Sequence, residues 1–134
     1  MRGEVCKEWL GDARGDLALA SIKKSRPMRY AHLCFHAQQA AEKSLKAVYL
    51  ALDLNLPKTH DLAYLMDNLP EKIVFPPSML MLPVLTKYAV QCRYPGQDIP
   101  VTRQDWLAAV ELAKATYRWA NRFVTASNTL ETTD

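Results

Sequence analysis

HAQQAAEKSLKAVY, residues 36–49, lies in the middle of the longest uninterrupted helical pattern in the chain. Neither glycine nor proline occurs between Pro27 and Pro57, so one helix of roughly seven turns is predicted there. Its apolar positions recur every three or four residues and, joined by Gln38, form one stripe: Cys34, Ala41, Leu45, Val48 and Leu52. A neighbouring stripe is polar in its middle: Phe35, Gln39, Glu42, Lys46 and Tyr49. Such a helix belongs at the centre of a bundle, and its polar side chains are the first candidates for function.

The other helical patterns predict an all-α, up-and-down four-helix bundle with one extra short helix. The chain has 134 residues, 49% hydrophobic and 23% charged, which suits one domain with a substantial core. We expect the bundle to span residues 1–126 and a frayed polar tail to span residues 127–134. No segment reaches the roughly 18 apolar residues of a membrane span, and the N-terminal segment is too acidic for a signal peptide. A cytoplasmic location is therefore expected.

The helices around the central one follow from the same spacing rules. The first is predicted over residues 5–24, with Asp16 at the edge of its apolar stripe. A carboxylate there should form an ion pair or hydrogen bond with a lysine of the central helix. Pro27 fits the first turn of the central helix. Thr59 fits the cap of a short third helix that ends at Pro70.

A fourth helix is predicted over residues 80–91, followed by the loop CRYPGQDIPVT, residues 92–102. Thr102 and Asp105 then resemble a capping box at the start of the last long helix, although aspartate replaces the usual glutamate. The pattern contains no strand alternation and no repeat, so the bundle consists of helices alone.

The direction of the third and fourth helices decides where the loop at Arg93 lies. The third helix spans roughly 13 Å against about 40 Å for the central helix, so the two short elements are expected to run in tandem. That route brings Arg93 to the end of the bundle with Arg29 and His36. If the two elements reverse, Arg93 meets Lys58 and His60 at the other end.

Positive charge is concentrated near one connection. The net charge is +3, but residues 1–50 hold 9 Lys or Arg against 5 Asp or Glu (+4), and residues 51–134 hold 8 against 9 (−1). Much of the excess lies in four closely spaced cations: Lys23, Lys24, Arg26 and Arg29. This run is either a solvated loop or a patch that attracts phosphate.

Motifs for metals and cofactors are missing from the sequence, so neither is predicted. The three cysteines are odd in number and contain no C-x-x-C pair, which predicts reduced thiols. His32 and His36 have helical metal-pair spacing, but no glutamate lies between them and no third ligand is evident. His60 is either a helix-start residue or a catalytic base. Glu42 and Lys46, four residues apart, can pair with each other.

Four separated motifs, WLGDARGDLALA, HAQQAAEKSLKAVYL, PKTHDL and CRYPG, together closely resemble the HEPN domain, named for higher eukaryotes and prokaryotes nucleotide-binding. The resemblance covers about residues 5–123. It implies a helical bundle, usually a homodimer, that acts with a minimal nucleotidyltransferase partner. Members of this family bind nucleotides or RNA, and some are ribonuclease toxins that the nucleotidyltransferase neutralises.

The resemblance also implies which residues form the site. The signature positions carried over by motif are Asp16, Gln39, Glu42, Lys43, Lys46, Lys58, His60, Asp61, Arg93 and Tyr94. Six of these are the predicted nucleotide- or RNA-binding residues: Gln39, Glu42, Lys43, Lys46, Arg93 and Tyr94. In that role Arg93 and Lys46 would contact phosphate, and Tyr94 would stack on a base.

The sequence departs from the HEPN ribonuclease pattern, in which an arginine is followed after four to six residues by a histidine. Arg93 matches the arginine, but residues 98–100 are Asp, Ile and Pro, and no histidine follows His60 anywhere. Arg29 and His36 have the required spacing but lie at the start of the central helix, the wrong element for the motif. The catalytic candidates are therefore Arg93 and His60.

Three functions follow as hypotheses. The first is a homodimeric module that binds a nucleotide or RNA and acts with a nucleotidyltransferase. The second is a metal-independent ribonuclease that uses Arg93 with His60 or His36. The third is a scaffold without catalytic activity, in which Glu42 and Lys46 belong to a buried polar network that fixes helix register.

Overall fold

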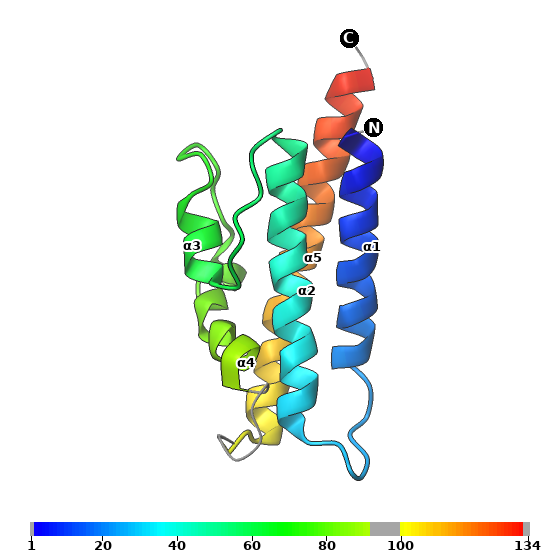
Figure 1. The fold of residues 1–134 in the computed structure, drawn as a ribbon, viewed down its shortest axis with the longest axis vertical. Coiled ribbons are helices and arrows are strands. Elements are labelled where there is room, and N and C mark those ends of the chain that lie inside the picture. Colours follow the sequence, from blue (N-terminus) through cyan, green and yellow to red (C-terminus); the bar gives the residue numbers. More distant parts are fainter. Residues whose placement is uncertain (1, 92–99, 133–134) are drawn as a thin grey trace.

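The computed structural model describes residues 2–91 and 100–132, and these residues form helices and connections without any strand. Three long helices make the frame (Figure 1): α1 (Arg2–Ala20), α2 (Tyr30–Ala51) and α5 (Arg103–Thr132). The shorter elements between them are α3 (Leu62–Asp67), η1 (Pro77–Met79), η2 (Leu82–Leu85) and α4 (Thr86–Gln91). The all-α prediction is thus confirmed. None of the described helices is both long and apolar enough to cross a membrane.

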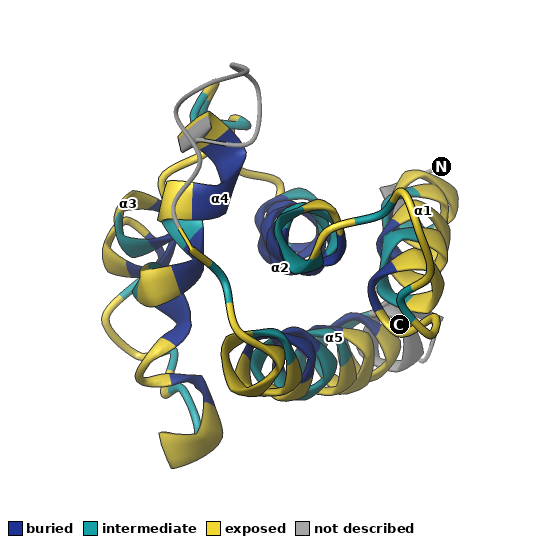
Figure 2. Ribbon diagram, turned by 90° about the horizontal axis from the view of Figure 1, so that it is seen from below, coloured by how far each residue is buried: buried dark blue, intermediate teal, exposed yellow. Residues whose placement is uncertain are grey.

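The central position of α2 is also as predicted. Figure 2 shows α2 surrounded by α1, by α5 and by the column of α3 and α4. Small side chains on several faces are fully buried and let the neighbouring helices approach closely: Ala37, Ala40, Ala41 and Ala47. Between them Leu45 and Val48 are completely buried, and each contributes about 1.5–3 kcal/mol of hydrophobic stabilisation.

The helix ends correct two predictions. Central helix α2 begins at Tyr30, so Pro27 lies in the preceding connection, and the Nδ1 atom of His32 accepts a hydrogen bond from the Arg29 amide at 3.0 Å. Helix α3 is capped by Asp61, whose carboxylate accepts from the Tyr64 amide at 3.3 Å, and the predicted cap at Thr59 was wrong.

The predicted capping box of α5 is confirmed. The Asp105 amide donates to Thr102 Oγ1 at 3.1 Å, and the Thr102 amide donates to the Asp105 carboxylate at 3.0 Å. These two hydrogen bonds satisfy backbone donors that a helix start leaves without partners. The Thr102 amide and the Thr102 side chain also lower the pKa of the Asp105 carboxyl, because hydrogen bonds to the carboxylate favour its ionised form. Helix α5 then continues to Thr132, into the segment predicted to be a frayed tail.

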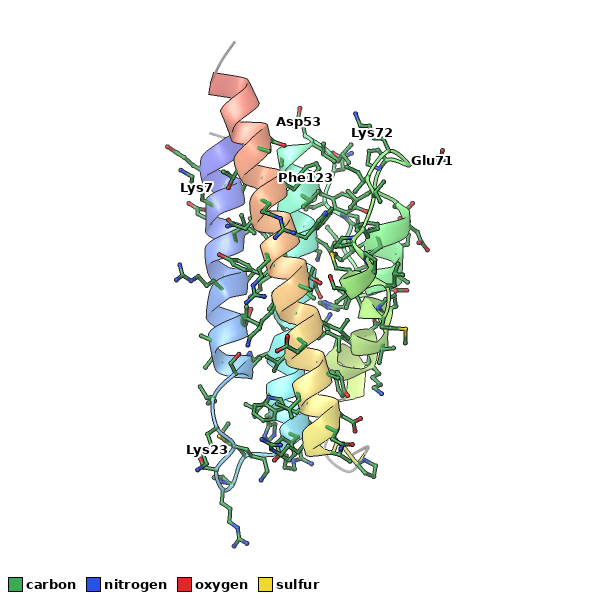
Figure 3. All side chains as sticks on the ribbon, turned by 180° about the vertical axis from the view of Figure 1, so that it is seen from behind. Lys7, Lys23, Asp53, Glu71, Lys72 and Phe123 are labelled. Atoms are coloured by element: carbon green, nitrogen blue, oxygen red, sulfur yellow. The ribbon has the colours of Figure 1, made fainter. Side chains whose placement is uncertain are left out.

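The chain between α2 and α5 takes a route that was not predicted. Residues 52–61 return along α2 without helix, α3 runs back, and the chain then descends through η1, η2 and α4 (Figure 1). Glu71 and Lys72 lie at the same end of the bundle as Asp53, whereas Lys23 lies at the opposite end (Figure 3). The tandem arrangement of the third and fourth helices was therefore wrong. The first half of the predicted fourth helix consists of turns and the 3-10 helix η2, and only its second half is the α-helix α4.

Even so, α5 begins at the end of the bundle that the tandem route implied. The indole of Trp106 donates to the Ala20 carbonyl oxygen at 2.7 Å, and its ring stacks on Tyr30 with centroids 5.5 Å apart. The first turns of α5 therefore contact the end of α1 and the start of α2. Residues 52–61 run back along part of α2, and α3 then runs in the opposite direction. The chain from η1 to α4 runs back once more and so ends near the start of α5.

Candidate functional site

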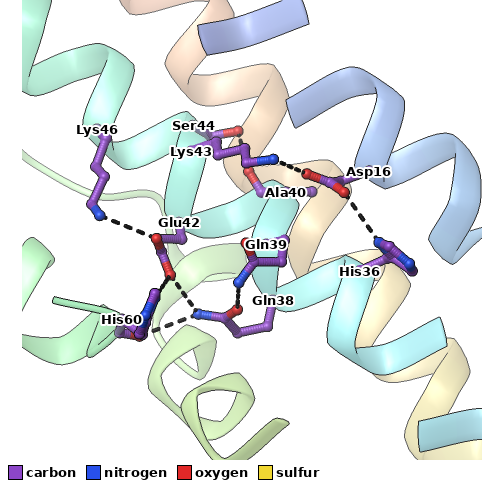
Figure 4. Close-up of polar contacts among 10 residues, drawn as sticks. All are labelled: Asp16, His36, Gln38, Gln39, Ala40, Glu42, Lys43, Ser44, Lys46 and His60. Atoms are coloured by element: carbon purple, nitrogen blue, oxygen red, sulfur yellow. Dashed lines mark hydrogen bonds and ion pairs between the residues drawn. The ribbon is translucent and has the colours of Figure 1, made fainter. Parts of the chain in front are cut away.

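Polar side chains of α2 form two groups, each built around one carboxylate (Figure 4). The first, the Asp16 group, consists of Asp16 of α1 with His36 and Lys43 of α2. One carboxylate oxygen lies 3.1 Å from His36 Nδ1, and the other lies 2.7 Å from Lys43 Nζ. His36 and Lys43 are seven residues apart, about two turns, and so share one face of α2. The predicted bond from Asp16 to a lysine of the central helix is confirmed.

The second, the Glu42 group, consists of Gln38, Gln39, Glu42 and Lys46 of α2 with His60 of the returning segment. Glu42 Oε1 accepts from Gln38 at 3.1 Å and lies 2.8 Å from His60 Nδ1, while Oε2 accepts from Lys46 at 3.1 Å. Gln38 also donates to the backbone oxygen of His60 at 3.2 Å, and Gln39 donates to Gln38 at 2.7 Å. The group thus joins residues 52–61 to α2.

Burial divides the Glu42 group. Gln38 is 0% exposed, Glu42 5% and Lys46 8%, whereas the side chain of His60 is 48% exposed. The buried members satisfy one another, as buried polar groups must if they are not to destabilise the fold. The opposite charges of Glu42 and Lys46 balance, so this pair adds no net charge to the interior, and His60 forms the edge of the group that faces water.

The two groups share one chemical plan. Each carboxylate is contacted by one lysine and one histidine, and in both cases the histidine uses Nδ1. A carboxylate that holds an imidazole in this way fixes its orientation, which is also how a general base is positioned in many enzymes. The described residues therefore contain two imidazoles that carboxylates orient, His36 and His60.

The structure brings together part of the predicted site. Gln39, Glu42 and Lys46 lie in one group, and Lys43 lies in the other. Arg93 and Tyr94, the remaining predicted binding residues, lie outside the residues that the structure describes. Their position relative to the two groups stays a prediction.

Sequence reasoning missed the two contacts made by histidines. Pairing of His60 with Glu42 and of His36 with Asp16 joins residues 18 and 20 positions apart, which no local spacing reveals. Gln38 was assigned to the apolar stripe, although its position four residues before Glu42 is the spacing of a helical hydrogen-bond pair. That spacing is the one signal that could have predicted its role.

Neither the histidine pair nor the surrounding acids forms a metal centre. His32 accepts the Arg29 amide as part of the start of α2. Over residues 2–91 and 100–132, no three His, Cys, Asp or Glu side chains come together in a way that could hold a metal ion.

A hollow of about 490 Å³ borders the Asp16 group between α1 and α2. It is lined by Glu8, Trp9, Asp12 and Lys43. The two carboxylates of α1 oppose an anion here, since like charges repel. Lys43 is therefore open to water on a side that is acidic rather than basic.

Comparison with known proteins agrees with this architecture. The HEPN domain family matches residues 6–123. The solved structure of TT1696 from Thermus thermophilus has 30% sequence identity and a TM-score of 0.76, and the match covers 88% of this chain and 97% of that chain. No curated protein matches significantly. Because the family match extends from α1 to α5 and includes both polar groups, the chain belongs to the HEPN family.

Proposed function

We propose that this HEPN protein is a nucleotide- or RNA-binding module that acts as a homodimer in the cytoplasm with a minimal nucleotidyltransferase, as in a toxin–antitoxin pair. The observation that carries the proposal is the Glu42 group, a connected polar network that leads from the centre of the bundle to a half-exposed imidazole. The basic run at residues 23–29 supplies further positive charge at the end where α5 begins.

Phosphate would be recognised by cations that the network already orients. An ammonium group carries three donors, so Lys46 can keep its bond to Glu42 and still donate to a ligand. The proposed binding residues remain Gln39, Glu42, Lys46, Arg93 and Tyr94. Lys43 leaves this set, because the nearby carboxylates of Glu8 and Asp12 oppose an anion. Glu42 acts within this set by positioning Lys46 and His60.

The test is a titration of the protein with ATP and with a short RNA, followed by amide chemical shifts. Signals of Lys46, His60 and Arg93 are expected to move, and Arg93→Gln is expected to weaken binding about tenfold because it removes a charged phosphate contact. Arg103→Gln is the matched control, since Arg103 is an exposed arginine at the start of α5. Equal loss in both variants, or shifts scattered away from α2, would contradict the proposal.

A ribonuclease is a second candidate, favoured by the two imidazoles that carboxylates orient. In that reaction His60 or His36 would take the proton from a ribose 2′-hydroxyl, and Arg93 would stabilise the negative charge on the phosphorane. RNA cleavage should then disappear in His60→Ala or His36→Ala while the fold persists. Cleavage that survives in both variants, or is undetectable in the wild type, would exclude this mechanism.

A scaffold is a third candidate, favoured by the mutual satisfaction of Gln38, Glu42 and Lys46. Under this hypothesis Lys46→Ala lowers the melting temperature, and the wild type binds neither ATP nor RNA measurably. Measurable binding by the wild type that Lys46→Ala weakens would instead favour the binding module.

A further inference from the structure

A second polar site, used by neither group, lies between α5 and the residues around η1. It is a pocket of about 360 Å³, within the range of small-molecule sites. Its lining combines charged, hydroxyl and apolar side chains, including Ser78, Glu111, Leu112, Ala115, Arg118 and Arg122. All except Ser78 come from the middle of α5.

Arg118 and Arg122 give the pocket a cationic end. They are four residues apart and therefore neighbours on one face of α5, and both are exposed. Among the described residues, neither guanidinium has a hydrogen bond or an ion pair. Two such groups offer ten N–H donors, and their planar forks match phosphate oxygens in bidentate fashion.

Glu111 gives the pocket an acceptor end. It lies seven residues before Arg118, about 10 Å along the helix. Its carboxylate is 73% exposed and only loosely paired with Lys114, at 3.7 Å, so it can accept a hydrogen bond from an amino group of a ligand. Leu112 and Ala115 form an apolar wall between the two ends.

Aromatic packing fixes the wall opposite α5. Phe75 packs on Trp119 with ring centroids 5.1 Å apart, and Trp119 packs on Phe123 at 5.8 Å. These contacts hold the residues before η1 against the helix that carries both arginines. The pocket is thus bounded by packed elements on both sides, which reduces the entropy lost when a ligand binds.

We propose that this pocket binds a mononucleotide, with Arg118 and Arg122 on its terminal phosphate and Glu111 on an amino group of its base. A phosphate at one end, an amino group of the base about two helical turns away and the flat base between them are what the lining can recognise. The inference deepens the proposed function by placing a nucleotide on α5, and it rests on that function only for the class of ligand.

The experiment compares AMP, adenosine, inorganic phosphate and an RNA oligomer without terminal phosphate, each titrated into the full chain and followed by amide shifts and calorimetry. AMP is expected to move the signals of Ser78, Ala115 and Arg118. Phosphate should move the arginine signals more weakly, and adenosine should move none of them. Adenosine binding as tightly as AMP, or the oligomer binding there more tightly than AMP, would overturn the proposal.

Variants test the assignment of the two ends. Arg118→Gln/Arg122→Gln is expected to weaken AMP binding about tenfold or more. The matched control, Lys7→Gln/Arg14→Gln, removes two exposed charges from α1 and should change the affinity less than twofold. Glu111→Gln should weaken AMP binding severalfold but leave phosphate binding intact. An equal loss in both double variants would show unspecific charge attraction and overturn the proposal.

The two proposals fail separately. Shifts confined to Lys46 and His60 would support the binding module at α2 and overturn the α5 pocket. Shifts confined to Ser78 and Arg118 would do the reverse. Unchanged melting temperatures of the double variants would establish that lost affinity comes from lost contacts.

Discussion

The Asp16 and Glu42 groups contain the same three kinds of charged side chain but differ in burial. In the Asp16 group the lysine is 27% exposed and the histidine 33%, whereas in the Glu42 group the carboxylate and the lysine are both almost completely buried. Buried charges depend on their partners far more than charges in contact with water. The same three kinds of side chain therefore give one group whose ion pair is buried, with only His60 open to water, and one group whose lysine and histidine are both partly open to water.

The largest expected effect tests this contrast directly. Lys46→Ala leaves the buried Glu42 carboxylate without its cation, and we expect the free energy of unfolding to fall by about 3 kcal/mol. Lys43→Ala removes a partly exposed partner of Asp16 and should cost about 1 kcal/mol or less. Urea denaturation measures both. A similar loss of unfolding free energy in Lys46→Ala and Lys43→Ala would contradict this contrast, because burial would then not distinguish the two groups.

A smaller effect is expected for the carboxylate of the more open group. Asp16→Ala removes hydrogen bonds to both His36 and Lys43 but leaves both side chains able to reach water, so a loss of about 1–2 kcal/mol is expected. Asp12→Ala, at an exposed position one turn earlier on α1, serves as control and should stay within about 0.5 kcal/mol of wild type. The same denaturation curves decide whether Asp16 differs from its control.

The smallest expected effect concerns Asp105, an exposed carboxylate that belongs to neither polar group. The capping hydrogen bonds with Thr102 lower the pKa of Asp105 below its ordinary 3.8, so ionised Asp105 stabilises the folded state. That contribution is fully present above the unfolded pKa and is lost as the pH falls through the lower folded pKa. Asp105→Asn should therefore melt slightly below wild type at neutral pH, and the difference should shrink as the pH falls below the ordinary pKa of an aspartate. A constant difference across that range would show that the charge of Asp105 is not involved.

Local signals predicted a large part of the fold. The central helix follows from a long stretch without breakers, and the capping box at Thr102 follows from residue type and spacing alone. Pro83 explains the main local error, because a residue without an N–H cannot continue the backbone bonding of an α-helix, and 3-10 turns replace much of the expected fourth helix.

The site was less predictable because its decisive contacts are not local. Glu42 and Lys46 could be paired from spacing, but the partner at His60 depends on residues 52–61 returning along α2. That segment has no periodicity from which its path could be inferred. The polar middle of α2 could be predicted from the sequence, whereas the path of residues 52–61 along it could not.

The return of residues 52–61 depends on an unusual kind of contact. The imidazole and the backbone oxygen of His60 both bond to α2, through Glu42 and Gln38. Apolar surfaces tolerate sliding, whereas hydrogen bonds are directional, so a slip of one residue would leave a carboxylate without its partner in the interior. We expect the Glu42 group to fix the position of residues 52–61 along α2 and to disfavour arrangements in which this segment is shifted by one residue.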